Sequence, residues 1–316
     1  MTRITGIPEG LTDGPRYLPE ETYDAQYGLF DVDNTIVGNN DPSLPSARFI
    51  EAVHTVGSTT VGLATARQWQ KVGHIIQGAE IYGPSIISNG AQIVDGRTGE
   101  MLLERAIPLD AANDIISTLQ MLGVEHWVQD NGVDVRWLGN EETQAHHRTS
   151  VRDHGTYARA HNIWLPPEGK NRAIVQNYEP HNPLVIVAHD ITQEMISEIH
   201  DIGSMYSDQH VTTLLAHETA QADGCKTYDI FFLDSRANKQ TAMNEVAEIT
   251  GVPVANMMAV DDGPNGAEIV GYAGVGVAMG NAVEKTRNAS VFVTADWQHD
   301  GAALAIERLM AASFTV

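Results

Sequence analysis

Short apolar runs alternate with amphipathic segments near both ends of the chain. Residues 27–32 and 60–64 form apolar runs of strand length, and residues 47–56 carry apolar side chains at helical spacing between them. Ser46 stands directly before that segment, where a serine side chain favours the start of a helix. Strands separated by helices are typical of parallel pairing, because parallel neighbours need a crossover connection. The sequence therefore predicts a layered α/β domain.

The middle third of the chain has a different pattern. Alternating apolar residues flank Asn131-Gly132, the dipeptide that favours a two-residue hairpin turn. The strand–helix alternation returns with an apolar run at residues 228–233 and a helical pattern at 237–249. The two ends of the chain are therefore expected to build one core around an insertion. We predict an α/β fold with a parallel-sheet, Rossmann-like core from residues 1–92 and 218–316, an N-terminal extension at residues 1–26, and an inserted α+β cap domain at residues 93–217.

Charge and composition narrow the classes of partner. The 316 residues are 42% hydrophobic and 19% charged, as in globular proteins, and their formal net charge of −22 disfavours nucleic acid and anionic membranes. No run approaches the roughly 18 apolar residues of a membrane span, and the start shows no secretory signal. Cys225 is the only cysteine, which excludes an intramolecular disulfide and fits a reducing compartment. We expect a soluble, cytoplasmic protein, and its oligomeric state is left open.

Two acids stand at the end of the first predicted strand. Asp31 and Asp33 are two residues apart, so in extended backbone their side chains project to the same side. Two carboxylates so close repel unless a cation or a shared proton relieves them, and Mg²⁺ favours one or two carboxylates together with phosphate oxygens. A calcium loop would need Gly and Glu where the chain has Ile36 and Pro42. A simple turn remains an alternative reading of the motif.

Two cations stand near the starts of predicted helices. Arg67 follows Thr65 at a strand–helix junction, and Lys239 lies near the start of the helix predicted at 237–249. A cation in a first turn opposes the helix dipole by roughly 0.3–1 kcal/mol, whereas an anion bound there is favoured by the dipole and the free N–H groups. The pair therefore suits a bound anion. Solvated basic side chains, with Thr65 as an ordinary helix cap, are the alternative.

A second acidic segment follows the apolar run at residues 257–260. Asp261 and Asp262 occupy a turn that also contains Gly263 and Asn265. Acid-rich turns that cap the next helix are common, so a structural role is one reading. A second carboxylate donor to a metal is the other, because ligands bind at the carboxyl edge of parallel sheets.

In this order, the motifs resemble those of the haloacid dehalogenase-like hydrolases, in the Cof-type sugar-phosphatase branch with a class IIB cap. The resemblance covers the chain from about residue 27 onward. It rests on Asp31 to Thr35, Thr65 to Arg67, Ser88 to Ala91, Lys239, Asp262 to Asn265, and residues 273–282.

The resemblance implies roles for the residues of the reacting centre. Asp31 would be the nucleophile and would form an aspartyl-phosphate. Asp33 would protonate the leaving oxygen and later activate water. Thr65 would hydrogen-bond the phosphoryl group, and Lys239 would neutralise its developing charge.

The resemblance also implies a metal site and a substrate site. Mg²⁺ would be held by Asp31, by the backbone carbonyl of Asp33, and by Asp262 and Asn265. Arg67, Asn89 and Gly90 would face the cap and contact the substrate.

The chain departs from the family pattern at four positions. Asn34 and Ala66 replace glycines, and both are small changes. The fourth motif normally ends in Asn-Asp, but Gly266 follows Asn265 here, and Asp261 stands where the branch usually has glycine. Which of the two acids, Asp261 or Asp262, is the metal ligand therefore stays open.

The expected function is that of a Mg²⁺-dependent phosphomonoester hydrolase acting on a small phosphorylated metabolite, with a sugar phosphate as the expected substrate class. A phosphomutase or phosphotransferase of the same family would share the chemistry but pass the phosphoryl group to another hydroxyl. A ligand-binding member with weakened catalysis is the alternative that Gly266 raises, and a phosphatase for nucleotides or cofactor phosphates is another.

Overall fold

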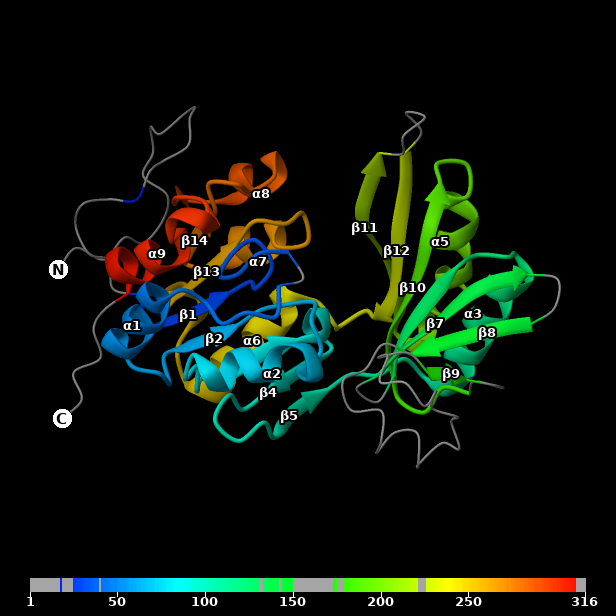
Figure 1. Ribbon diagram of the computed structural model, residues 1–316, viewed down its shortest axis with the longest axis horizontal. Helices are drawn as coiled ribbons and strands as arrows, with labels where there is room; N and C mark the ends of the chain where they lie inside the picture. The colour runs from blue at the N-terminus through cyan, green and yellow to red at the C-terminus, as the bar shows by residue number, and fades with distance from the viewer. Residues whose placement is uncertain are drawn as a thin grey trace.

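The computed structural model describes residues 18, 25–39, 41–130, 133–141, 144–149, 173–175, 179–220 and 226–310. The predicted extension at residues 1–26 lies almost wholly outside this part of the chain. Figure 1 shows two bodies side by side, one built from both ends of the chain and the other from its middle. Among the described residues, no helix has the length and apolar character needed to cross a bilayer.

The core contains a parallel sheet in which the first strand of the chain lies between two others. Its order is β15-β14-β13-β1-β2, and each neighbouring pair is parallel. β1 pairs on one side with β2 and on the other with β13, with Phe30 opposite Val260. The strands are β1 (Tyr27–Phe30), β2 (Val61–Leu63), β13 (Met257–Asp261), β14 (Val275–Ala278) and β15 (Phe292–Val293).

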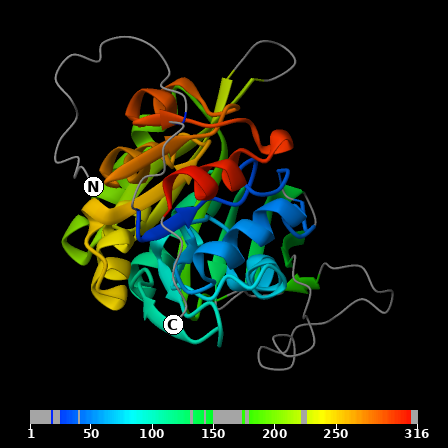
Figure 2. The same cartoon turned by 90° about the vertical axis from the view of Figure 1, so that its left-hand side faces the viewer.

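Helices cover both faces of this sheet because successive side chains of β1 point to opposite sides. Phe30 packs with helices α1, α2 and α9, whereas Leu29 packs with α6 and α7, and α8 packs on α7. Ser46 caps α1 by accepting a hydrogen bond from the Phe49 N–H at 3.1 Å, as predicted. Figure 2 shows α1 and α9 side by side on the core. The helices are α1 (Ala47–Val56), α2 (Trp69–Gly78), α6 (Lys239–Thr250), α7 (Ala267–Tyr272), α8 (Glu284–Ala289) and α9 (Gly301–Leu309), with short 3₁₀ turns η3 (Val254–Asn256) and η4 (Trp297–His299).

A small antiparallel sheet extends the core beyond β2. It has the order β3-β4-β5, and a bridge between Ala64 and Ile86 joins it to the end of β2. The predicted cap boundary at residue 93 is therefore wrong, because β4 pairs with β3 of the core and β5 pairs with β4. Hairpin pairing alone does not reveal which domain a hairpin joins. The elements are β3 (Ser85–Ile87), η1 (Ser88–Gly90), β4 (Gln92–Val94) and β5 (Met101–Glu104).

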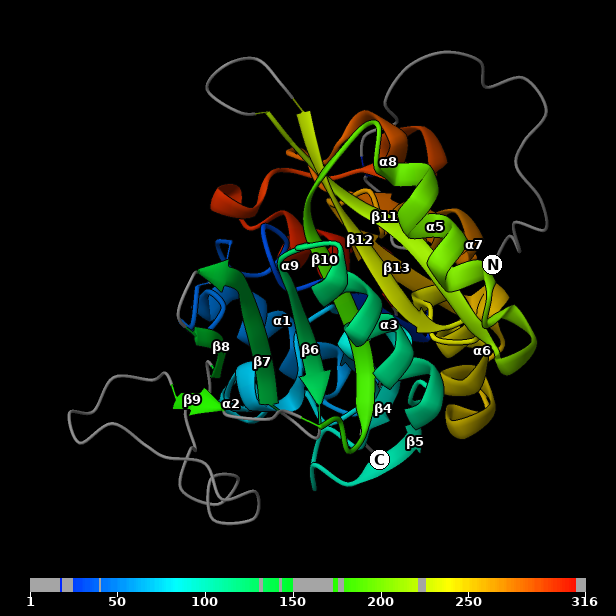
Figure 3. The same cartoon turned by 90° about the vertical axis from the view of Figure 1, so that its right-hand side faces the viewer.

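Within the described residues, the cap is a seven-stranded sheet with two helices on one face (Figure 3). The hairpin predicted around Asn131-Gly132 is confirmed, since β6 and β7 pair with Asp130 opposite Val133. Strand β10 continues through Thr192, and the helix that follows it, α5, begins at Ile196. The elements are α3 (Leu109–Met121), β6 (His126–Asp130), β7 (Val133–Glu141), β8 (Gln144–Thr149), β9 (Ala173–Val175), β10 (Pro183–Thr192), α5 (Ile196–Ser204), η2 (Ser207–Gln209), β11 (Val211–Ala220) and β12 (Lys226–Asp234).

Strand β12 corrects the second predicted boundary. The sequence placed the run at residues 228–233 in the returning core, but β12 pairs antiparallel with β10 and β11 inside the cap sheet. A buried central strand reads as one apolar run in a parallel or an antiparallel sheet, so the pattern does not reveal its partners. The cap therefore includes residues up to Asp234, beyond the predicted end at 217.

Candidate active site

A buried lysine joins two acids at the carboxyl edge of the core sheet. Lys239 is the first residue of α6, whose start is fixed by the Asn238 side chain accepting from the Thr241 N–H at 2.7 Å. The Lys239 ammonium lies 2.8 Å from Oδ1 of Asp31, just past β1, and 2.7 Å from Oδ2 of Asp261, the last residue of β13. Their exposed fractions are 3%, 8% and 1%. The sheet order makes this possible, because β1 and β13 are neighbours.

One ammonium does not neutralise the carboxylates around it. Burial raises the pKa of Asp31 well above its ordinary value; Lys239 opposes this and Asp261 adds to it. Burial alone would lower the pKa of Lys239, but the Asp261 and Asp31 carboxylates outweigh burial and raise it. The lysine is therefore held as a cation at neutral pH, and the site keeps an excess of negative charge.

Asp262 brings a third carboxylate to the same place. Ligand atoms of Asp31, Asp261 and Asp262 all lie within 4.8 Å of one another. The pKa of Asp262 is raised to about 6, first by burial and then by Asp261. Its oxygens have two long contacts, from the Thr35 hydroxyl and the Asn281 amide, each at 3.4 Å. Crowded carboxylate oxygens with an excess of negative charge suit a hard divalent cation such as Mg²⁺.

Asp33 and Arg67 form a bidentate ion pair beside these acids. Nε and Nη2 of Arg67 donate to the two Asp33 oxygens at 3.0 and 2.7 Å, and Nη1 donates to the Asp41 carbonyl at 3.0 Å. Thr65 is buried, and its hydroxyl accepts from the Arg67 N–H at 3.1 Å. Helix α2 starts only at Trp69 with Gln68 in the capping position. The alternative reading of Thr65 as that helix's cap is therefore wrong.

The remaining predicted residues lie on turns around the acids. Asn89 sits in η1 with a φ of 58°, and its side-chain oxygen is 3.4 Å from the Asn265 amide nitrogen. Gly90 has a φ of 98°, and a Cβ built there would overlap the backbone of Asn238, directly before Lys239. Glycine is thus required at position 90 for backbone conformation and close packing, so its structural role is clear while a substrate contact stays a prediction.

A cap residue that the sequence analysis did not single out reaches the core at this point. Gln129 on β6 is 5% exposed, and its amide nitrogen approaches the carbonyl of Ala66, between Thr65 and Arg67, at 3.5 Å. Its side-chain oxygen has no hydrogen-bond partner among the described residues. In the sequence, Gln129 could be noticed only as an amide side chain within an apolar strand, between the buried residues Val128 and Asp130. This pattern does not show that the side chain faces the core domain.

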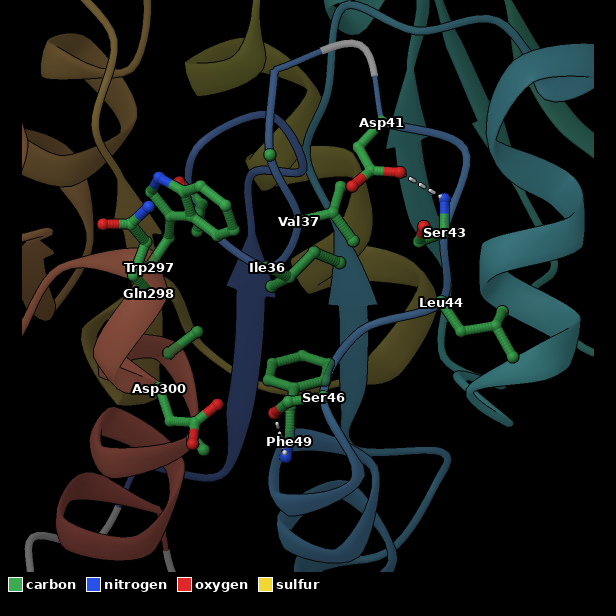
Figure 4. Close-up of a pocket in the computed structure, with 14 residues that line it drawn as sticks. Ile36, Val37, Asp41, Ser43, Leu44, Ser46, Phe49, Trp297, Gln298 and Asp300 are labelled. Atoms are coloured by element: carbon green, nitrogen blue, oxygen red, sulfur yellow. Dashed lines mark hydrogen bonds between the residues drawn. The ribbon is translucent and has the colours of Figure 1, made fainter.

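A cavity of about 210 Å³ lies next to the loop that follows β1 (Figure 4). Ile36, Val37, Phe49 and Trp297 give it apolar walls, and the Asp41 and Ser43 side of the loop closes one edge. Thr35 lines it, but its lining residues do not include the three acids around Lys239. The cavity is therefore adjacent to the acidic site and not part of it.

Comparisons with known proteins point to one family. A family model for haloacid dehalogenase-like hydrolases matches residues 29–306. HMP-PP phosphatase of Serratia proteamaculans is 23% identical over 268 residues, covering 82% of this chain and 85% of that protein. The putative phosphatase YkrA of Bacillus subtilis is 27% identical over 172 residues, covering 46% and 67%.

Solved structures agree at the level of the fold. BT1666 of Bacteroides thetaiotaomicron, a phosphatase of the haloalkanoate superfamily, superposes with a TM-score of 0.65 at 21% identity and covers 95% of this chain and 98% of its own. The subclass IIB sugar phosphatase BT4131 gives a TM-score of 0.62 at 18% identity, covering 91% and 98%. The family model spans most of the sequence, and the chain therefore belongs to the haloacid dehalogenase-like hydrolases.

Proposed function

We propose that the chain is a Mg²⁺-dependent phosphomonoester hydrolase that transfers the phosphoryl group through Asp31. The observation that carries this proposal is the contact of Lys239 with Asp31, buried at the sheet edge beside Asp262. A buried lysine against a carboxylate nucleophile places positive charge where a phosphoryl group would gain negative charge during transfer.

The residues divide the reaction into two displacements. Lys239 contacts Oδ1 of Asp31, which leaves Oδ2 to attack phosphorus. The Asp31–phosphorus bond forms as the ester bond to the leaving oxygen breaks, and Asp33 supplies that oxygen with a proton. Water then attacks the aspartyl-phosphate and gives its proton to Asp33, and the step releases phosphate and restores Asp31.

The ion pair of Asp33 with Arg67 must change during this cycle. The two guanidinium hydrogen bonds occupy both oxygens of Asp33, whereas the first step needs Asp33 to deliver a proton to the leaving oxygen. An arriving phosphate ester is itself an anion that can bind the same guanidinium bidentately. Arg67 therefore moves its hydrogen bonds from Asp33 to the substrate, and the acid is released for proton transfer.

Asp262 is the proposed carboxylate ligand at the fourth motif, together with Asp31, the Asp33 carbonyl and Asn265. Both oxygens of Asp261 are occupied, one by Lys239 at 2.7 Å and the other by the Gly263 N–H at 2.8 Å. The side-chain contacts of Asp262 with Thr35 and Asn281 are longer, each at 3.4 Å. Mg²⁺ held there would neutralise charge on the phosphoryl oxygens.

A sugar phosphate is the proposed substrate class. The family includes proteins described as sugar phosphatases, and the cap brings to the edge of the site the Gln129 amide oxygen, which has no hydrogen-bond partner in the described part of the chain. A hydroxyl-rich leaving group would supply the donor that this oxygen lacks. A phosphomutase would share the first step. It differs from a hydrolase only in the second step, in which a sugar hydroxyl and not water accepts the phosphoryl group.

Phosphate release from a panel of phosphorylated sugars, nucleotides and an aryl phosphate tests the function. The panel is run with Mg²⁺ and with chelator, on the wild type beside Asp31→Asn. Mg²⁺-dependent release that is absent from the variant supports the proposal. Release only after an acceptor sugar is added favours phosphotransfer, and no release from any compound contradicts both.

A further inference from the structure

Gly266 and Asp261 compete for one volume beside Lys239. A Cβ built on Gly266 would overlap all three atoms of the Asp261 carboxyl group. The backbone of Gly266 does not require glycine, because its φ of −84° and ψ of −15° are open to any residue. Position 266 is therefore glycine because the Asp261 side chain fills the space into which a side chain at 266 would extend.

The Asp261 carboxylate has a defined task in that space. It is 1% exposed, one oxygen lies 2.7 Å from the Lys239 ammonium, and the other accepts from the Gly263 N–H at 2.8 Å. Since the same ammonium lies 2.8 Å from Asp31, Asp261 sets the position of Lys239 against the nucleophile. Asp261 acts through Lys239 and is a positioning residue.

We propose that Asp261 supplies the carboxylate that positions Lys239, and that this carboxylate can be provided from position 261 or from position 266 but not from both. The family pattern has glycine at 261 and aspartate at 266, so this chain carries the reciprocal arrangement. Gly266 does not mark a weakened site, because Asp261 supplies the carboxylate instead. The catalytic half of this inference rests on the proposed function.

Four proteins test the exchange: the wild type, Asp261→Gly, Gly266→Asp, and the double variant. Asp261→Gly leaves Lys239 without its second partner, and kcat should fall about 10²–10³-fold with a smaller change in KM. Gly266→Asp should also lose activity, because the new side chain displaces Asp261. The double variant should regain kcat to within about 10-fold of the wild type, an interaction between the two sites that independent mutations do not show.

Gly271→Asp in the Asp261→Gly background is the matched control. It adds the same side chain within α7, the helix that follows Gly266 directly, at a position where the nearest atom to a new Cβ is the Cβ of Ala289 at 3.5 Å. It should restore no activity. Rescue by Gly271→Asp, or a well-folded double variant no more active than Asp261→Gly, would overturn the proposal.

Thermal unfolding in the presence of a chelator tests whether positions 261 and 266 share one space, and this test needs no catalytic activity. Gly266→Asp should lower the midpoint in the wild-type background and not in the Asp261→Gly background, where the space is vacant. If Gly266→Asp lowers the unfolding midpoint equally in both backgrounds, the two side chains do not share one space and the proposal is overturned. If the wild type releases no phosphate, the proposed function fails, while this unfolding cycle still decides the spatial half of the inference.

Discussion

Arg67 holds Asp33 through two guanidinium nitrogens, at 3.0 and 2.7 Å, while its third nitrogen is bonded to the Asp41 carbonyl. The Arg67 side chain is 9% exposed and that of Asp33 29% exposed, so this pair is more protected than a surface ion pair. The arrangement joins the proposed acid–base group to the proposed substrate cation before any substrate arrives. Because the pair uses two parallel hydrogen bonds, the planar shape of the guanidinium should matter as well as its positive charge.

Arg67→Lys should lower kcat/KM about 10- to 100-fold, because an ammonium keeps the charge but loses the two parallel hydrogen bonds. Steady-state kinetics on the best substrate of the panel measures the loss. Arg48→Lys is the matched control, since Arg48 makes a similar bidentate pair with Glu307 on the surface between α1 and α9. It should leave kcat/KM unchanged, and an unchanged value for Arg67→Lys would remove Arg67 from the anion site.

Asp31→Asn should reduce phosphate release by about 10⁴-fold or more, the scale on which loss of a covalent nucleophile acts. In chelator its unfolding midpoint should equal or exceed that of the wild type, because one of three crowded carboxylates is removed while Lys239 keeps Asp261. Asp41→Asn is the control, since Arg67 bonds the Asp41 carbonyl and not its carboxylate. Appreciable turnover by Asp31→Asn would exclude the nucleophile role.

The raised pKa of Asp262 predicts that the stability of the folded protein falls as the pH rises. Its pKa is about 6 in the folded protein, above the ordinary 3.8, so the folded state binds its proton more tightly than the unfolded chain does. The stability from this protonation is complete below about pH 4 and is lost as the pH rises to about 6. In chelator, the midpoint of the wild type relative to Asp262→Asn should therefore fall across that window. If the difference between the two unfolding midpoints stayed constant or rose with pH, the raised pKa of Asp262 would be contradicted.

Magnesium should reverse that loss above pH 6. A ligand that binds only the folded state raises its stability by about 2.7 kcal/mol at one hundred times its Kd. The wild-type midpoint should rise with added Mg²⁺ at pH 7, and much less at pH 5, where Asp262 is protonated. Asp262→Asn should respond weakly at both values. An equal Mg²⁺ response from the variant would move the ligand role to another acid.

Gln129→Leu should raise KM for sugar phosphates by about 5- to 10-fold, the effect of one neutral hydrogen bond. An aryl phosphate without hydroxyl groups provides the internal control, because its leaving group offers nothing to the Gln129 oxygen. Its kinetics should change little. Equal effects on both substrate types would show that Gln129 only holds the cap against Ala66.

The sequence was most informative where local rules decide the outcome. The helix after Ser46 has the predicted bounds, since capping and helical spacing are properties of neighbouring residues. The parallel core with an antiparallel cap was also predicted, and the order of motifs led to the family that the comparisons confirm. The family resemblance placed Asp31 and Lys239 in one reacting centre, and the structure places Oδ1 of Asp31 2.8 Å from the Lys239 ammonium.

The failures concern contacts between distant parts of the chain. Strand β12 was given to the wrong sheet, because its apolar run fits either partner. The pairing of Arg67 with Asp33 was missed because it depends on how two loops at neighbouring strand ends face each other. The exchange between Asp261 and Gly266 was visible only as two departures from a pattern, and the overlap of their side-chain positions required coordinates.

The position of β1 between β2 and β13 has a consequence for biosynthesis. Strand β13 begins at Met257, so a growing polypeptide completes every described cap strand before β1 receives its second neighbour. Until then β1 has an unpaired edge, which can pair with other chains. Asp31 meets its lysine only after α6 emerges from the ribosome. A nascent chain therefore lacks the contact between Lys239 and Asp31 until residue 239 is made, and a chain that ends before β13 leaves one edge of β1 unpaired.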